Sequence, residues 1–297
     1  MTAASASHRL LNFVQSALLL GLMAAIAWIA VTAIVGPETG LLMALAMVGG
    51  LLFAPALPRR LLLSAYQAQR LTGRDAPGLV AALAELARRA GLQRAPALYR
   101  VPSRLPNAFA LGSPEDSAIC VTDGLLNLLD GRELAGVLAH EIGHIANRDL
   151  WIMSLADMMS RLVSLASWLG QLLLLLNLPL VLAGMVHVPW HVVILLVFAP
   201  TLMALVQLGL SRTREYDADR AAAELTGDPE GLVRALVKLE RRVGRFWEEI
   251  LLPGRRIPEP SLLRTHPPTE SRIRRLRDLV TGRTTPIPAL VGYPTAR

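Results

Sequence analysis

The chain has 297 residues, of which 53% are hydrophobic and only 18% charged, and its mean hydropathy is +0.44. Soluble domains carry about 25% charged residues, and here the apolar residues gather in four blocks, which is typical of a membrane protein. The net charge is +7, and its 30 basic residues flank the apolar blocks and fill the C-terminal third, without a basic patch interleaved with aromatic residues, which predicts contact with anionic lipid and argues against a nucleic-acid-binding protein.

The first two apolar blocks, Leu10–Val35 and Leu41–Leu57, are separated by the polar turn Gly36–Gly40. The first block is long enough to cross a bilayer, which takes about 20 residues of helix. A cleaved signal peptide is the alternative, since Arg9 precedes the first block, but the apolar run is long for one and a second block follows at once. We therefore expect a transmembrane hairpin over residues 1–60.

The soluble piece over residues 61–150 begins with a mixture of helix and strand. Ala76–Gly91 carries the apolar stripe of an amphipathic helix, which Gly91 ends. Three short strands are expected, at Ala97–Val101, Asn107–Leu111 and Ala118–Thr122. The single cysteine, Cys120, excludes an intrachain disulfide and a thiolate zinc cluster, and its apolar neighbours predict a buried side chain.

A helix that carries the motif His140-Glu141-Ile142-Gly143-His144 follows. Asp130 and Glu133, three residues apart, predict an N-cap with a capping box at its start. We expect the helix to continue to about Asp149 or, alternatively, into the third apolar block. Two histidines four residues apart lie on one helix face and can bind one metal ion, with the intervening glutamate as general base. This is the arrangement of zinc-dependent hydrolases.

The third and fourth apolar blocks, Leu162–Val186 and Val188–Leu210, predict a second transmembrane hairpin within residues 151–211. Asp157 and Arg161 are four residues apart and predict a structural ion pair where the helix nears the membrane. The turns inside both hairpins carry no Lys or Arg, which places the opposite ends of the blocks, both termini and all soluble chain in the cytoplasm. The basic residues at those ends are Arg9, Arg59, Arg60, Arg148, Arg161, Arg212 and Arg214.

A catalytic zinc ion usually has three protein ligands, and the second soluble piece, residues 212–297, offers the third. Glu215 and Asp219 follow the fourth block and share a helix face, so one could bind zinc while the other accepts a hydrogen bond from a ligand histidine. The alternative is an acidic juxtamembrane turn that pairs with Arg212, Arg214 or Arg220. His187 and His191, four residues apart in the far turn, are interpreted as interfacial residues, with an accessory metal pair as the alternative.

Over nearly its whole length the chain resembles the HtpX-type integral membrane zinc metalloproteases, relatives of the CAAX prenyl proteases. The resemblance rests on the N-terminal hairpin and on the segments Pro106–Ala110, Val121–Leu126, His140–His144 with Asn147 and Asp149, Glu215 with Asp219, and Thr265–Pro268 with Glu270 and Arg272. It implies that Glu215 is the third zinc ligand and that Asp219 supports the ligands. It also implies proteolysis of damaged or misfolded membrane proteins from the cytoplasmic side, in envelope quality control.

Several further residues receive roles in this interpretation. Glu141 takes a proton from water and passes it to the leaving amine. His266 is the candidate donor to the oxyanion, and Arg272 is a weaker candidate or supports Asp219 or Glu215. Asn147 and Asp149 either orient a ligand histidine or serve the C-terminal surface of the helix. Asn107, Ala108 and Phe109 begin an edge strand that pairs with an extended substrate, or else an ordinary core strand.

The sequence thus predicts a mostly α membrane protein with four transmembrane helices and a cytoplasmic α+β, zincin-like metalloprotease domain built from residues 61–150 and 212–297. One Zn²⁺ is expected per chain, with unfolded or membrane-protein substrates, lipid contact, no nucleic acid and an open oligomeric state. The expected location is a bacterial-type cytoplasmic (inner) membrane. Alternatives are a protease whose motif lies within the lipid, which the charges around His140 oppose, and a non-catalytic zinc-binding scaffold, regulator or transporter, which would not need Glu141.

Overall fold

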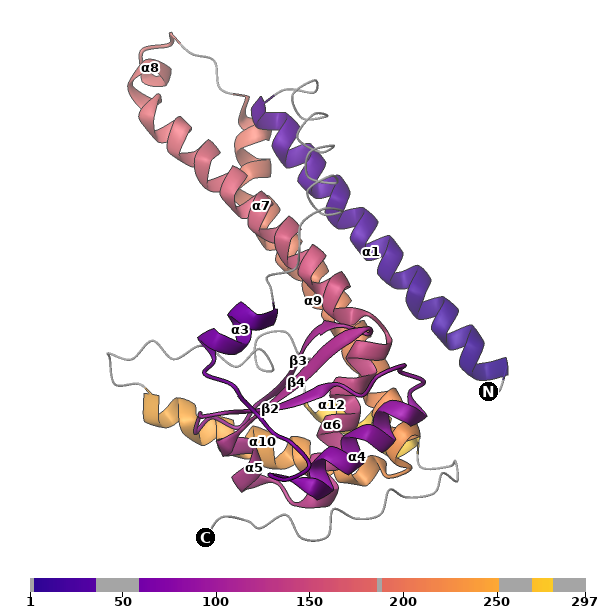
Figure 1. The fold of residues 1–297 in the computed structure, drawn as a ribbon. Helices are drawn as coiled ribbons and strands as arrows, with labels where there is room; N and C mark the ends of the chain where they lie inside the picture. The colour runs from indigo at the N-terminus through magenta and orange to yellow at the C-terminus, as the bar shows by residue number, and fades with distance from the viewer. Residues whose placement is uncertain (1–2, 36–58, 186–188, 251–268, 280–297) are drawn as a thin grey trace. The chain divides into compact units, whose positions relative to one another are not determined.

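The computed structural model describes residues 3–35, 59–185, 189–250 and 269–279 (Figure 1). The chain divides into two compact units. Unit 1 comprises Met1–Pro55 and Ile152–Thr213, and unit 2 comprises Ala56–Trp151 and Arg214–Arg297. The predicted block Leu41–Leu57 and the predicted donor His266 lie outside the described residues.

Unit 1 is a set of long apolar helices. They are α1 (Ala3–Val35), most of α7 (Asp149–Leu176), the short α8 (Leu178–Leu182) and the first part of α9 (Trp190–Thr226). Met23, Ala156 and Met203 belong to one buried cluster that joins α1, α7 and α9, while many other leucines on these helices are exposed. Two of the described helices, α7 and α9, are long and apolar enough to cross a membrane, and Val14–Ala30 in α1 is a shorter apolar segment.

The helices of the second predicted hairpin do not follow the limits of the apolar blocks, whose facing ends Val186 and Val188 lie outside the described residues. Helix α7 begins at Asp149 rather than Leu162 and ends at Leu176, and α8 begins beyond it with Pro179 in its first turn. Proline lacks the backbone N–H that would continue the preceding helix. Helix α9 continues past Arg212 to Thr226, so that Glu215 and Asp219 lie on the same continuous helix as the fourth apolar block.

Unit 2 contains a four-stranded mixed sheet. Its strands β1 (Gln69–Arg70), β2 (Ala97–Val101), β3 (Ala108–Ser113) and β4 (Asp116–Thr122) lie in the order β1-β2-β4-β3. Strand β2 pairs with β4 in parallel, and β3 pairs with β4 in antiparallel, with Ala108 opposite Val121. The three predicted strands are therefore confirmed to within two residues, and β3 is an edge strand rather than a central one.

Helices cover both faces of this sheet. On one face, Ala108 and Ala110 join a large cluster with α4 (Pro77–Arg89), α6 (Gly131–Ala146) and α10 (Pro229–Ile250). On the other face, Phe109 packs with Cys120 and with Leu63 of α3 (Arg59–Ala65), and its ring lies 4.9 Å from that of Tyr66. Because neighbouring residues of a strand point to opposite faces, Phe109 faces away from α6.

Cys120 is fully buried, as the sequence predicts, and burial raises the pKa of its thiol to about 12. We expect no reaction with a thiol reagent at pH 8 in the folded protein and complete reaction after unfolding, because the thiolate is the reactive form. With a reagent that releases a chromophore on reaction with a thiol, the absorbance measures the extent of reaction in the folded and in the unfolded protein. Since the folded state holds this proton more tightly than the unfolded chain, its contribution to stability declines as the pH rises from about 9 toward 12. Rapid labelling of the folded protein at pH 8 would contradict this.

Helix α6 begins and packs as its sequence directs. The Asp130 side chain accepts from the Glu133 N–H at 2.9 Å and the Glu133 carboxylate accepts from the Asp130 N–H at 2.9 Å, which confirms the predicted capping box. Glu133 is buried and pairs with Lys238 of α10 at 2.6 Å. A Cβ added to Gly136 would lie 2.8 Å from the Leu232 backbone nitrogen, so glycine is required where α6 and α10 approach closely.

The end of α6 differs from the prediction. The helix ends at Ala146, not at Asp149, with Asn147 at its C-cap and Arg148 in the left-handed region at a φ of 59°. Helix α7 then begins at Asp149. This change of direction places the Asp149 side chain beside the last turn of α6.

Candidate metal centre

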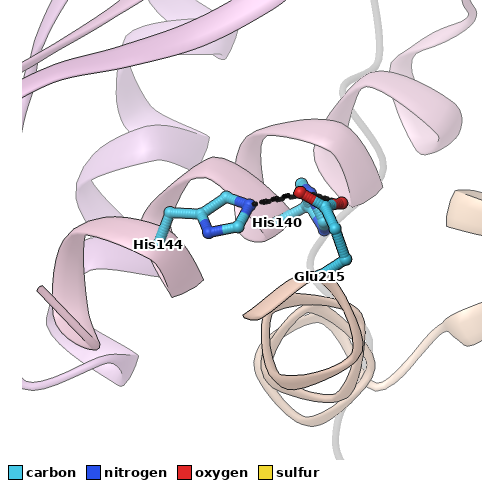
Figure 2. A group of neighbouring side chains, drawn as sticks. All are labelled: His140, His144 and Glu215. Atoms are coloured by element: carbon cyan, nitrogen blue, oxygen red, sulfur yellow. Dashed lines mark hydrogen bonds and ion pairs between the residues drawn. The ribbon is translucent and has the colours of Figure 1, made fainter. Parts of the chain in front are cut away.

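Three side chains from α6 and α9 converge on one point in unit 2 (Figure 2). His140 and His144 lie one turn apart on α6, and Glu215 reaches them from α9. The Nε2 atoms of the two histidines are 3.1 Å apart. His140 Nε2 is 3.4 Å from Glu215 Oε2, and His144 Nε2 is 3.5 Å from Glu215 Oε1. All three residues are buried or nearly so.

Gly143 permits this approach of the two helices. A Cβ at Gly143 would lie 3.1 Å from the Ala221 Cβ and 3.2 Å from the Ala218 Cα. Small residues therefore meet on both helices one turn from the convergent side chains. The helix that carries the two histidines and the helix that carries Glu215 are in direct backbone contact at this point.

The three distances fit a zinc ion. Zinc bonds to histidine nitrogen and carboxylate oxygen are about 2.0–2.2 Å long in a tetrahedral site, which separates any two ligand atoms by about 3.3–3.6 Å. The observed separations of 3.1, 3.4 and 3.5 Å are close to these values. Three protein ligands leave a fourth position open, as in catalytic zinc sites.

The Nδ1 atoms of both histidines, which point away from the convergent Nε2 atoms, lie beside carboxylates. His144 Nδ1 lies 2.9 Å from Asp149 Oδ2, and His140 Nδ1 lies 3.1 Å from Asp219 Oδ1. Because an ionised carboxylate only accepts hydrogen bonds, the bond to Asp149 holds the proton of a neutral His144 ring on Nδ1 and directs its Nε2 lone pair inward, and the carboxylate of Asp219 beside His140 Nδ1 favours the same tautomer there. In this tautomer two nitrogen lone pairs and a carboxylate converge, which favours the binding of a cation.

The electrostatic field in this part of unit 2 favours positive charge. Burial lowers the pKa of His140, but the carboxylates of Asp219 and Glu215 outweigh burial and raise it above its ordinary value. For His144, burial is likewise outweighed, here by Asp149 and Glu215, and the pKa is raised well above its ordinary value.

The carboxylates of Asp219 and Asp149 each accept hydrogen bonds from a buried arginine. Arg272 of α12 (Thr269–Asp278) donates to Asp219 from Nε at 2.7 Å and from a terminal nitrogen at 2.6 Å, and it lies 3.3 Å from Glu215 Oε2. Arg214 donates to Asp149 Oδ1 at 3.3 Å. Both arginines are less than 8% exposed. Each of the two histidines thus lies against an arginine–aspartate pair.

The remaining predicted residues take these places. Arg272 lies against Asp219 and Glu215, which favours its supporting role over direct contact with substrate. Asn147 has an exposed side chain at the helix C-cap, so of its two predicted roles the structure favours the surface one. Asp149 contacts His144 instead. His191 is exposed at the start of α9, whereas His187 lies outside the described residues.

Arg214 is the site residue that the sequence interpretation missed. The sequence assigns Arg214 to the basic end of the fourth block and, as an alternative, to a pair with the acidic segment beside it, whereas it pairs with Asp149, 65 positions earlier in the chain. Its position next to Glu215 was the one available signal. Glu141, the predicted base, is 4% exposed within α6.

The carboxylates behind the histidines should tune metal affinity. We expect Asp219→Asn and Asp149→Asn each to weaken zinc binding by roughly 10–100-fold, because the ligand rings lose both orientation and basicity. Competition with a chromogenic chelator measures the affinity. Asp228→Asn is the matched control, since Asp228 pairs with Arg132 outside the site, and it should leave zinc binding unchanged. Equal affinities for all three variants would contradict these roles.

Comparison with known proteins places the chain in a family. The sequence profile described as Peptidase family M48 matches residues 74–280. A protein named Protease HtpX homolog from Persephonella marina is 35% identical over 300 residues, covering 91% of this chain and 98% of that protein, and its namesake from Acaryochloris marina is 37% identical, covering 91% and 95%. The solved structure of S. mikatae Ste24p has a TM-score of 0.49 at 20% identity, covering 91% of this chain and 66% of that one. From its sequence similarity, the chain belongs to peptidase family M48, in the group of HtpX proteases.

Proposed function

We propose that this chain is a zinc-dependent endopeptidase that cleaves misfolded or damaged membrane proteins from the cytoplasmic side of a bacterial inner membrane, as part of stress response and quality control. Its family makes it a membrane metalloprotease. The observation that carries the finer proposal is the convergence of His140, His144 and Glu215 at 3.1–3.5 Å. One Zn²⁺ per chain fits this set of donors.

The chain's own residues supply the proton transfers. When bound, zinc would polarise the scissile carbonyl and make water more acidic. Glu141 follows His140 on α6 and is buried in the same part of the helix, where a carboxylate can accept a proton from the attacking water. The same carboxylate then delivers the proton to the leaving nitrogen. We assign stabilisation of the oxyanion to His266, in the segment before α12.

Strand β3 offers an edge on which an extended substrate can pair. The Thr122 N–H donates to the Asn107 carbonyl, and the Asn107 N–H donates to Thr122 Oγ1, so by the alternation of an antiparallel ladder the backbone groups of Ala108, Ala110 and Gly112 point to the open edge. Asn107 Oδ1 is buried and has no hydrogen-bond partner within the part of the chain that the structure describes. Main-chain pairing, with Asn107 contacting the substrate backbone, suits a protease of unfolded chains. Phe109 does not face the open edge, because by the same alternation its backbone groups point to β4, where it lies opposite Cys120, and its ring packs on the face with Leu63.

The proposed topology has four transmembrane helices, with both termini and the metal centre in the cytoplasm. The arginine distribution supports it, and α7 and α9 have the length and composition of membrane spans. The domain limits proposed are 1–60 and 151–211 for the hairpins and 61–150 with 212–297 for the protease. Substrates and lipid are the proposed partners, without nucleic acid.

The test is cleavage by the full-length protein in lipid nanodiscs. Zinc-loaded protein should cleave both unfolded casein and a destabilised membrane protein, stop after chelation, and recover when zinc is restored. Cleavage of a loop only when that loop faces the same side as the enzyme's termini supports the proposed orientation. Bound zinc with no cleavage of either substrate would instead support the non-catalytic scaffold.

A further inference from the structure

Helix α7 carries an exposed polar stripe in an otherwise apolar unit. Ser154, Asp157, Arg161, Ser164 and Trp168 follow one another at intervals of three or four residues, so they lie along one face of the helix. The Asp157 and Arg161 side chains are 50% and 79% exposed and form an ion pair at 2.7 Å, which confirms the predicted pair. Trp168 is 60% exposed.

Contacts within unit 1 show which residues of α9 lie beside this ion pair. Ser160 Oγ lies 2.5 Å from Gln207 Oε1, and the Ser167 hydroxyl donates to the Leu196 carbonyl, so α7 and α9 run antiparallel with Ser160 level with Gln207. Arg161 is therefore level with residue 206. At a rise of 1.5 Å per residue, it lies about 9 Å farther along the bundle than Arg212, the first charged residue that closes the apolar part of α9.

At this level α9 presents leucine to its surroundings. Leu205 is 60% exposed and Leu202 is 46% exposed, and α9 has no Asp, Glu, Lys or Arg from 190 to 211, a length of about 33 Å that matches the hydrocarbon layer. The pair on α7 is thus displayed at a depth where the neighbouring helix meets lipid. Ionisable residues at such depth are costly and mark functional surfaces.

We propose that this stripe is the docking surface for a substrate's transmembrane helix that carries a polar or charged residue within its span. The inference rests on the proposed proteolytic function and names its substrate class. The spacing of three and four residues is that of a helix–helix seam, and polar side chains are what hold helices together in lipid. A membrane protein that has lost its partners exposes such residues.

Other occupants fit less well. The Asp157 carboxylate, bound to the Arg161 Nε, would repel the phosphate of an anionic lipid. The segment Leu41–Leu57 of this chain has no polar side chain, so it offers no complement to the pair. A second copy of the chain is an outcome that the experiment below distinguishes.

The experiment uses two single-span reporter proteins that differ only in one residue of the span, Lys in one and Asp in the other. The full-length zinc-loaded enzyme in nanodiscs cleaves each, and the ratio of kcat/KM for the Lys and Asp reporters is measured. Arg161→Gln leaves the carboxylate and should raise this ratio roughly fivefold, whereas Asp157→Asn leaves the guanidinium and should lower it by a similar factor, the size of one polar contact between membrane helices. Arg220→Gln on α9, which removes another exposed pair with Glu224, is the control and should not change the ratio.

Cleavage of unfolded casein distinguishes an effect on the docking surface from an effect on catalysis, because casein has no transmembrane helix. Its rate should remain unchanged in all three variants. Shifts in the same direction for Arg161→Gln and Asp157→Asn, or no shift, would overturn the docking surface, as would an effect that follows the anionic lipid content rather than the reporter's charge. If the wild-type enzyme cleaves neither casein nor reporters, the proposed function fails. In that case the docking surface is tested separately, with a photo-crosslinker at Trp168 in the Glu141→Gln protein. Capture of a reporter span supports the proposed docking surface, and capture of a second copy or of lipid overturns it.

Discussion

Replacing Glu141 with glutamine is expected to lower peptide cleavage by roughly 10²–10⁴-fold while zinc remains bound, the range that general acid–base catalysis contributes. The substitution keeps the size of the side chain and removes its capacity to accept a proton. Glu141 is not among the three convergent side chains, which are His140, His144 and Glu215. The metal should therefore be retained when the carboxylate is lost.

The measurement pairs turnover on unfolded casein with zinc content per chain. Glu224→Gln is the matched control, since Glu224 forms an exposed pair with Arg220 on the surface of α9, and it should leave both quantities unchanged. Activity near the wild-type value in the Glu141 variant would assign the base to another group. Loss of zinc from that variant would make Glu141 a structural support of the site instead.

Local sequence signals predicted the elements that carry the site. The capping box at Asp130 and Glu133 predicts the start of α6, because its side-chain hydrogen bonds involve neighbouring residues only. The spacing of His140 and His144 then follows from the geometry of one helix. Strand β2 matches its predicted limits because turn residues bound a short run of apolar and β-branched residues there.

Features that depend on distant contacts could not be predicted in this way. The end of α6 rests on Arg148, a residue in the left-handed conformation at a position without glycine, where sequence gives no warning. The pairs Arg272–Asp219 and Arg214–Asp149 join residues 53 and 65 positions apart. Only the folded unit shows that His140 and His144 each lie against an arginine–aspartate pair.

The same limit applies to strand β3. Its presence was predicted, but which face carries Phe109 depends on the register with β4, where Phe109 lies opposite Cys120. Shifting the pairing by one residue would exchange the two faces. The ring therefore belongs to the cluster with Leu63 rather than to the side of the metal centre.

Glu215→Ala should remove zinc and activity together. Glu215 contributes the only carboxylate oxygens within 3.5 Å of both histidine Nε2 atoms among the described residues, and its loss leaves two ligands where a catalytic site needs three. Substitutions behind the ligands cost roughly 10–100-fold in affinity, so loss of a direct ligand should exceed about a hundredfold. The variant should also leave Arg272 without one of its two buried carboxylate neighbours.

Zinc content after dialysis against a competing chelator, read beside casein cleavage, tests this expectation. Glu224→Ala, nine residues farther along α9 in an exposed pair, controls for loss of a carboxylate from the same helix. Because Arg272 remains bonded to Asp219 in the Glu215 variant, α12 should stay packed on α9, and the zinc-free variant should remain folded, with a cooperative thermal unfolding at or below the temperature of the zinc-free wild type. A Glu215 variant that keeps its zinc would transfer the third-ligand role to Asp219, the other carboxylate on this face of α9.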